Sequence, residues 1–380
     1  MSRNLRLALA SAALAALLAA CGGGGADTEP RVAITSVKVM GDSLADVGTF
    51  GLKFTVQGAD SLTYSERVPL AYGLPAGCPF FLFDGSTFIA NPAAGCVNYA
   101  IGGGVINPAS SGLAPTDPRA IGVQLATAVA AGNHGANDLL LIDGGGNDAA
   151  ALVGAYLAAS GDGGASYLAL LGTVLTPEQV QAAAGGGAAG LANAGGQYMT
   201  ALAASFSATL RAQALDKGAT RIALLNIPTI TNTPRFQAVL GGIEAQAGSA
   251  ARAQSEQLFR GWVAAFNAEL ARQFAGDARV AIVDLATAFD EQIADGAQFG
   301  ITNNRDTACP VTGLGSDGLP TYDFATCTAA ALSANPPAGA TGGADWWKTW
   351  YFSDGFHPTP YGHQLAFQLI SRTLARAGWL

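Results

Sequence analysis

Ser43 is the first residue of this 380-residue sequence whose position could support chemistry. It follows Gly41 and Asp42 at the end of an apolar run, in the stretch VMGDSLADVG. Serine and aspartate are common in turns and at helix N-caps, so a strand that simply ends at a turn is one interpretation. The other is a nucleophile held at a strand-to-helix corner, with its hydroxyl exposed and the first N–H groups of the helix beside it.

A serine nucleophile needs a base, and the sequence contains three histidines. His357 lies in the stretch SDGFHPTPYG, three residues after Asp354. This spacing allows the carboxylate to bind Nδ1 of the imidazole, which leaves Nε2 free to take the serine proton. His134, in a loop, and His363, in the last helix, suit structural roles better. The pattern therefore predicts a triad of Ser43, His357 and Asp354.

The oxyanion formed by such a nucleophile needs hydrogen-bond donors, and three segments offer them. One donor is the backbone N–H of Ser43. The triple glycine after Ile101 offers N–H groups that no side chain obstructs. Asn147, in the stretch GGGND, offers a side-chain amide. Glycine clusters are also ordinary turns, and Asn-Asp after a strand also caps a helix, so each donor has a structural alternative.

The elements that must position these residues alternate between strand and helix. Such alternation predicts a mostly parallel sheet with helices on both faces, with the site beyond the carboxyl ends of the strands. The segments 149–196 and 295–350 are rich in Gly, Ala, Thr and Pro and look like excursions that border a pocket. Strands are predicted over 34–40, 97–101, 138–146, 220–228 and 278–285, and helices over 197–218, 244–276 and 361–378.

The first residues of the chain are typical of an export signal. Arg3 and Arg6 precede an apolar stretch that ends in small residues before Cys21. Leu-Ala-Ala-Cys resembles a bacterial lipobox, in which the cysteine becomes the lipidated first residue; an ordinary secretory signal is the alternative. We therefore expect a signal peptide over 1–20, a lipidated Cys21 with a flexible tether over 21–33, and one domain over 34–380. The expected location is the cell envelope, at an outer membrane by analogy.

The remaining four cysteines suit an oxidising compartment, where an even number is expected to form disulfides. Two local pairs with equal spacing are favoured, Cys78 with Cys96 and Cys309 with Cys327. The sequence contains no Cys-x-x-Cys and no histidine cluster, so no metal site is expected. The formal net charge of −8 argues against nucleic-acid binding.

Four short segments, taken in order, carry a resemblance to a known family. They are GDSLADVG, NYAIGGG, GGGND and SDGFHP. They resemble the four sequence blocks of the GDSL, or SGNH, hydrolase family of serine esterases and lipases, and LLNIPTITNTP and VAIVDLATAFDE resemble its later strands. The resemblance covers about residues 35 to 380, the two excursions excepted. It implies a flavodoxin-like three-layer α/β/α sandwich and no cofactor.

The resemblance also implies a role for each matching residue. Ser43 would be the nucleophile, His357 the base and then the acid, and Asp354 the residue that orients it. The oxyanion hole would consist of the N–H of Ser43, the side chain of Asn147 and a glycine N–H, aligned to Gly103 with Gly102 as a near-equal candidate. Asp148 is expected to cap a helix, and Asp42 and Asp46 receive no role.

The function expected from these features is hydrolysis of a carboxylic ester by an exported protein. Lipids, acylated sugars and polyesters all suit the chemistry. The aromatic stretch 346–351 would line an acyl or sugar-binding wall, or pack in the core. An acyltransferase would use the same residues. A non-enzymatic surface lipoprotein is the third hypothesis, and its expected mark would be the loss of one of the residues named above.

Overall fold

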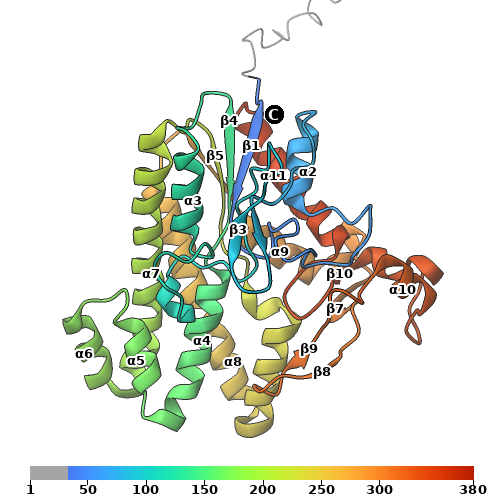
Figure 1. The fold of residues 1–380 in the computed structure, drawn as a ribbon. Helices are drawn as coiled ribbons and strands as arrows, with labels where there is room; N and C mark the ends of the chain where they lie inside the picture. The colour runs from blue at the N-terminus through green and yellow to red at the C-terminus, as the bar shows by residue number, and fades with distance from the viewer. Residues whose placement is uncertain (1–32) are drawn as a thin grey trace, which may run out of the picture. The chain divides into compact units, whose positions relative to one another are not determined.

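The computed structural model describes residues 33–380, which fold around a four-stranded parallel sheet (Figure 1). The spatial order of the strands is β1-β4-β5-β6. Most of their side chains are Val, Ile, Leu or Ala and are buried, as a sheet covered on both faces requires. The strands are β1 (Ser36–Met40), β4 (Asp138–Ile142), β5 (Ile222–Leu225) and β6 (Val280–Val283).

Helices cover both faces of this sheet, so the fold is a three-layer α/β/α sandwich (Figure 1). Alternate residues of one strand face opposite layers: Leu140 packs in one core cluster and Leu141 in the other. One layer contains α3 (Ile121–Ala130), α7 (Gly187–Gln213) and α8 (Pro234–Gln273), and the other contains α2 (Tyr64–Ala71) and α11 (Pro360–Arg376), with α9 (Leu285–Ala294) beside α11.

The register of the strands brings their carboxyl ends to one edge. Met40 lies opposite Ile142, Ile142 opposite Leu224, and Leu224 opposite Ile282. The loops that follow all four strands therefore leave from the same end of the sheet. Ile34 lies at the other end, in the core cluster against which the last residue, Leu380, also packs.

The predicted strand over 97–101 is wrong. This segment runs beside β1, where Val39 exchanges backbone hydrogen bonds with Val97 and Tyr99, but only Asn98 forms bridges, one to Val39 and one to Pro79. The side chain of Asn98 ties the segment to the serine loop, because its amide donates to the carbonyl of Ala45 and its oxygen accepts the N–H of Ala100. The segment therefore lies against β1 without forming a regular strand of its own.

The first predicted excursion, 149–196, is helical. Its alanine content favours helices, and Tyr167 and Leu171 are buried in the same core cluster as Trp262 of α8. The predicted helices 197–218 and 244–276 begin earlier than expected, and α8 is kinked at Gly248. The helices of this segment are α4 (Gly146–Asp162), α5 (Ala165–Leu171), α6 (Pro177–Gly185) and the first part of α7.

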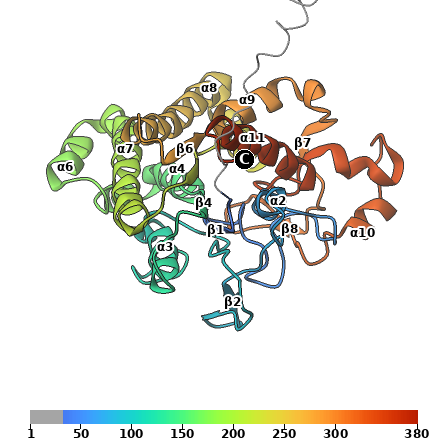
Figure 2. The same ribbon diagram turned by 90° about the horizontal axis from the view of Figure 1, so that it is seen from above.

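The second excursion, 295–350, lies on the opposite side of the sheet from the first, as the positions of α10 and α6 show (Figure 2). Its strand β7 pairs in parallel with β10, which leads into the loop of Asp354 and His357. Its elements are η4 (Gly296–Phe299), β7 (Asn303–Thr307), β8 (Gly313–Leu314), β9 (Pro320–Thr321), α10 (Ala329–Ala334) and η5 (Gly343–Thr349), followed by β10 (Trp350–Phe352).

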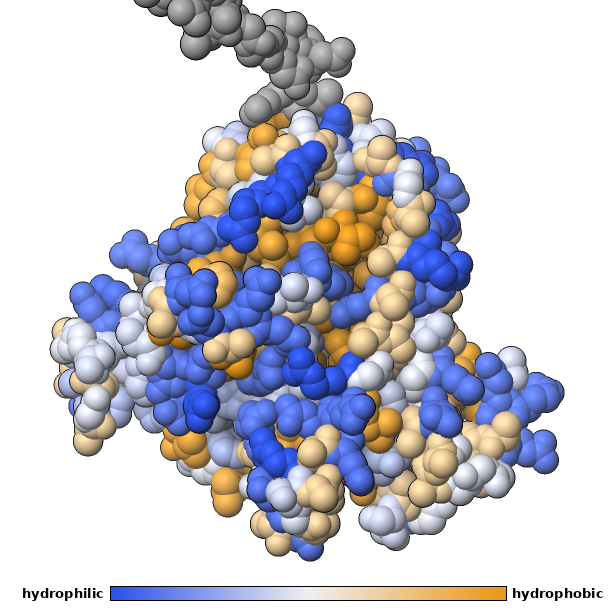
Figure 3. Space-filling model, turned by 180° about the vertical axis from the view of Figure 1, so that it is seen from behind, coloured by the Kyte–Doolittle hydropathy of each residue, from blue (hydrophilic) through white to orange (hydrophobic). Residues whose placement is uncertain are grey.

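Both predicted disulfides are confirmed, Cys78–Cys96 and Cys309–Cys327. Cys21, with the predicted signal and tether, lies outside the described residues. No helix within the described residues 33–380 has the length and apolarity needed to cross a membrane. Seen from behind, hydrophilic residues cover much of the surface and hydrophobic ones gather between them (Figure 3). The short elements not yet named are β2 (Phe81–Phe83), β3 (Phe88–Ala90), η1 (Pro108–Ser111), η2 (Leu215–Lys217) and η3 (Ile230–Asn232).

Candidate active site

Ser43, His357 and Asp354 form a continuous chain of hydrogen bonds. Ser43 Oγ lies 2.8 Å from Nε2 of His357. Nδ1 of the same ring lies 2.9 Å from both carboxylate oxygens of Asp354. This arrangement leaves Nε2 in position to accept the serine proton, because the carboxylate holds the proton of the ring on Nδ1.

The loop that carries Asp354 and His357 is fixed by its own backbone. Oδ1 of Asp354 accepts the N–H groups of Phe356 at 2.8 Å and of His357 at 2.6 Å. Thr359 caps α11 and donates to the carbonyl of Trp350 at 2.6 Å, which ties the end of the loop to β10. The aspartate thus holds both the histidine ring and the turn that presents it.

Burial and charge act in opposite directions on this pair. Burial by itself lowers the pKa of His357, but the charge and hydrogen bond of Asp354 outweigh it and hold that pKa above its usual value. Burial also raises the pKa of Asp354, and His357 together with two backbone N–H groups outweighs this, so its pKa is below the usual range. The carboxylate therefore stays ionised, and the imidazole is a stronger base than a free one.

The corner that presents Ser43 depends on the glycine two residues before it. A Cβ on Gly41 would lie 1.5 Å from Oδ1 of Asp143, so only glycine lets that carboxylate approach. Oδ1 of Asp143 accepts the N–H of Asp42 at 3.0 Å. The side chain of Gln124 binds both the N–H and the carbonyl of Gly41. The loops after β1 and β4 are thereby locked together directly before the serine.

The structure distinguishes Gly102 from Gly103, the two candidate donors in the glycine loop (residues 102–104) that the sequence left open. The N–H of Gly102 donates to Oδ2 of Asp46 at 2.8 Å, so this donor is already used. Gly103 lines the cavity beside Ser43 and has a φ of +77°, a conformation that favours glycine. The amide of Asn147 lines the same cavity and donates to the carbonyl of Gly104 at 2.9 Å. Ser43, Gly103 and Asn147 therefore surround one space.

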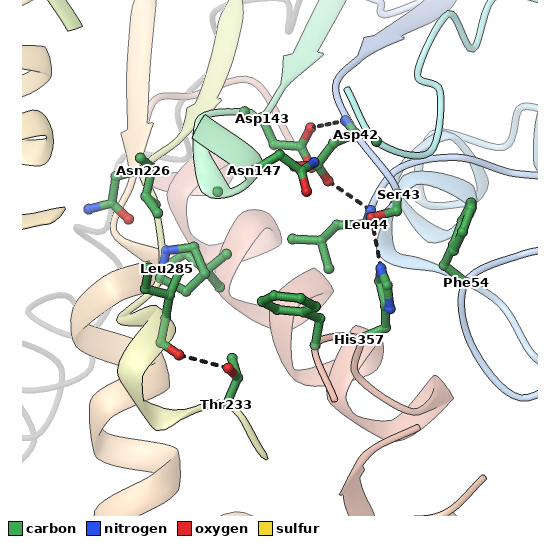
Figure 4. A pocket seen from close by; sticks show the side chains of 17 residues that line it. Asp42, Ser43, Leu44, Phe54, Asp143, Asn147, Asn226, Thr233, Leu285 and His357 are labelled. Atoms are coloured by element: carbon green, nitrogen blue, oxygen red, sulfur yellow. Dashed lines mark hydrogen bonds between the residues drawn. The ribbon is translucent and has the colours of Figure 1, made fainter. Parts of the chain in front are cut away.

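That space is a mostly apolar cavity of about 200 Å³ at the carboxyl ends of all four sheet strands. Figure 4 shows Ser43 and His357 on one side of it and Leu285 and Thr233 across from them. Its lining residues are Asp42, Ser43, Leu44, Phe54, Gly103, Asp143, Gly144, Gly146, Asn147, Asn226, Ile227, Pro228, Ile230, Thr233, Leu285, Phe356 and His357.

A buried group of acids behind the serine was not found by sequence reasoning. The hydroxyl of Tyr64 donates to Oδ2 of Asp143, and Oδ1 of Asp42 accepts the N–H of Leu44 at 2.9 Å. Burial and the neighbouring Asp143 raise the pKa of Asp42 to about 8. Burial raises the pKa of Asp143 to about 6. Asp42 and Asp143 both border the cavity, so their protonation sets the charge next to the serine.

The sequence assigns no role to Asp46, and the structure places it between the serine loop and the glycine loop. It is fully buried, and Oδ1 accepts the N–H groups of Gly48 and Thr49 at 2.8 Å each. Its other oxygen binds Gly102. The signal that could have identified it is the spacing Asp46-x-Gly48-Thr49, which is typical of an aspartate that closes its own turn.

Asp148, His134 and His363 lie outside the hydrogen-bond chain of Ser43 and have structural contacts. Asp148 does not cap its own helix: it accepts the N–H groups of Ile106 and Asn107, both at 2.9 Å, and so fastens the glycine loop to α4. His134 lies beside Lys38, and His363 accepts the N–H of Tyr64. Burial lowers the pKa of His363 to about 3, so this ring is neutral.

The aromatic stretch 346–351 is mostly core. Trp346 and Trp347 are buried around the disulfide Cys309–Cys327, and Tyr351 is buried beside Phe289. Within residues 33–380, no group of three or more His, Cys, Asp and Glu side chains is arranged to hold a metal ion.

One comparison with known proteins assigns a family to this arrangement. Residues 37–370 match the family described as GDSL-like Lipase/Acylhydrolase. The matched region includes both blocks that carry Ser43 and His357. No curated protein matches the chain.

Proposed function

Because the chain belongs to the GDSL-like lipase/acylhydrolase family, we propose that it hydrolyses carboxylic esters with Ser43 as nucleophile, His357 as base and Asp354 as the residue that orients the base. The observation that carries this proposal is the hydrogen-bond chain from Ser43 Oγ through His357 to Asp354. Such a chain activates a hydroxyl that is otherwise a weak nucleophile.

In the first half of the reaction, Ser43 Oγ attacks the ester carbonyl carbon while Nε2 of His357 takes the hydroxyl proton. The carbonyl oxygen becomes an oxyanion and accepts hydrogen bonds from the N–H groups of Ser43 and Gly103 and from the amide of Asn147. When the intermediate collapses, the alcohol leaves with the proton from His357, and an acyl ester remains on Ser43.

In the second half, water attacks the acyl ester and gives its proton to His357. The acid leaves, and Ser43 recovers its proton from Nε2. One N–H of the Asn147 side-chain amide donates to the carbonyl of Gly104 at 2.9 Å, which leaves its second N–H for the oxyanion. A donor with a partner in the free state keeps its orientation before substrate arrives.

The cavity supports an apolar acyl group as the part of the ester that is buried. Leu44, Ile227, Ile230, Leu285 and Phe356 line it. Asn226, a polar residue on the far side, already donates to Asp284 and accepts the N–H of Ala286. Hydrocarbon in this cavity would remove apolar surface from water and leave these polar groups paired.

The decisive test measures hydrolysis of p-nitrophenyl esters with acyl chains from two to twelve carbons. Wild-type protein should hydrolyse the short or medium members, and Ser43→Ala should abolish turnover. Adding a primary alcohol at increasing concentration separates hydrolysis from acyl transfer, because a transferase forms the new ester in preference to the acid. Absence of turnover across the whole series would refute an esterase.

We also propose that the protein is exported and held at the cell envelope by lipid on Cys21. Two disulfides in the described residues support export, because such bonds persist in oxidising compartments. Cys21→Ser should prevent lipidation, which mass spectrometry of the N-terminal peptide measures. Wild-type protein released with an unmodified N-terminus beyond residue 21 would contradict the anchor.

A further inference from the structure

A second pocket, larger than the cavity at Ser43, lies in the excursion 295–350. Its volume is about 880 Å³, against about 200 Å³ for the cavity at Ser43. Its walls come from β7, the loop before β8, α10 and β10. We call it the excursion groove. It forms no part of the hydrolytic mechanism derived above.

The excursion groove lies directly beside the active site. Thr233 lines the cavity at Ser43, and the next residue, Pro234, lines the groove. The loop of Asp354 and His357 runs between the cavity and the excursion groove. A Cβ on Gly355 in this loop would lie 3.7 Å from the ring of Tyr322, which lines the groove. The excursion groove and the cavity at Ser43 are therefore neighbours on the two sides of this loop.

The chemistry of the groove differs from that of the cavity. Tyr322 and Trp350 are half-buried and offer aromatic surface, while Arg305 and Asn335 are exposed and offer charged and amide groups. A sugar ring matches this mixture, because its C–H faces pack on aromatic rings and its hydroxyls bind guanidinium and amide groups. A hydrocarbon chain would bury the same polar groups without partners, which is unfavourable.

The walls of the groove are held in place before any ligand binds. The disulfide Cys309–Cys327 crosses the excursion, and the N–H of Cys309 donates to the carbonyl of Ser353 at 2.8 Å. The indole N–H of Trp346 donates to the carbonyl of Leu332 at 2.8 Å. Arg235 at the start of α8 forms an ion pair with Asp317. A preformed groove loses little freedom on binding, which favours affinity.

We propose that the excursion groove binds the sugar chain of an acylated glycan, so that an ester on that chain reaches Ser43. The proposal rests on the proposed esterase function and assigns the groove to the leaving alcohol. Ser43 Oγ attacks the acyl carbon, which breaks its bond to the sugar oxygen, and water then cleaves the acyl ester on Ser43. The acyl group passes through Ser43 to a free acid, and the sugar hydroxyl departs with the proton from His357.

The test compares kcat/KM on acetylated xylo-, cello- and chito-oligosaccharides of two to six sugars with kcat/KM on p-nitrophenyl acetate. In wild-type protein, the ratio should rise about tenfold with length in at least one series, which one aromatic contact and one charged hydrogen bond can supply. Arg305→Ala and Trp350→Ala should each flatten this rise. Arg376→Ala, an exposed arginine on α11, is the matched control and should retain it.

Three results would overturn the proposal: a flat ratio in all three wild-type series, a rise that Arg305→Ala leaves unchanged, or a rise that Arg376→Ala removes equally. If Trp350→Ala fails to fold, Arg305→Ala decides alone. Failure of the esterase itself would appear as no turnover of p-nitrophenyl acetate. In that event, calorimetric titration of Ser43→Ala with the acetylated hexasaccharides still tests the groove, and absence of binding in every series rejects it.

Discussion

The carboxylate of Asp46 binds the backbone N–H of Gly102 at 2.8 Å, and this contact joins the serine loop to the glycine loop. Asp46 also accepts two N–H groups within its own turn. One buried side chain therefore fixes the position of the next residue, Gly103, relative to Ser43. We regard Asp46 as a positioning residue for the oxyanion hole.

Replacement of Asp46 tests this relationship. Asp46→Ala leaves buried N–H groups without an acceptor and should lower the free energy of unfolding by about 1–3 kcal/mol. It should also reduce kcat more than it raises KM, because in the proposed mechanism the N–H of Gly103 acts on the oxyanion and not on the ground state. Denaturant unfolding and steady-state kinetics measure both effects. Asp60→Ala, at an exposed aspartate of a nearby loop, is the control. A loss of stability with kcat intact would leave Asp46 with a purely structural role.

Ser43→Ala and His357→Ala should each lower kcat on a p-nitrophenyl ester by about 10⁴-fold or more, because the two side chains act in one proton transfer. The double variant should be scarcely worse than either single variant. Steady-state kinetics of the three proteins measures this, with circular dichroism to establish that each is folded. Losses that multiply in the double variant would mean that the residues do not share a step.

Asn147→Ala should lower kcat by about 10²–10³-fold with little change in KM, as expected for one donor that acts on the oxyanion. Asn147→Asp is the informative companion, since it keeps the shape but replaces the donor with an acceptor and should be at least as damaging. A change confined to KM would place Asn147 in substrate binding instead.

The acid behind the serine predicts how stability depends on pH. The pKa of Asp42 rises from 3.8 to about 8 on folding. A raised pKa means that the folded state holds the proton more tightly. Its stabilising contribution is therefore complete below pH 3.8 and is lost as the pH rises through about 8.

The thermal midpoint should accordingly fall between pH 5 and pH 8, with Asp143 adding to the fall near its pKa of about 6. Asp42→Asn, which keeps the neutral shape, should reduce the fall, whereas Asp60→Asn should not. Scanning calorimetry in a series of buffers measures this. An equal fall in wild-type protein and Asp42→Asn would show that Asp42 is ionised throughout.

The sheet could be predicted from sequence because β1, β4, β5 and β6 are short apolar runs that end in glycine or small polar residues. The segment 97–101 has the same composition, yet it bridges β1 only at Asn98 and forms no regular strand. Nothing in local propensity distinguishes these cases. The helices within 149–196 were missed for a related reason, since glycines obscure an alanine-rich pattern whose stability comes from packing on α8.

Some residues around the cavity could also be predicted from the sequence, and others could not. Types and spacing were enough to single out Ser43, His357 and Asn147, which the structure brings to one cavity. The choice between Gly102 and Gly103 needed the position of Asp46, and the pairing of Asp42 with Asp143 joins residues about a hundred positions apart. Contacts of this kind depend on the register of β1 and β4, which a single sequence does not contain.

Ile34 and the C-terminus lie at one end of the sheet, beside the start of β1, and Ser43 follows the other end of that strand, so both ends of the folded unit face away from the catalytic opening (Figure 1). A molecule immobilised through either end would keep its opening towards the surrounding medium. Its products would diffuse outwards, not into the supporting surface. The points of attachment therefore lie away from the active site. A fusion partner or solid support at either end should leave the rate of ester cleavage unaltered.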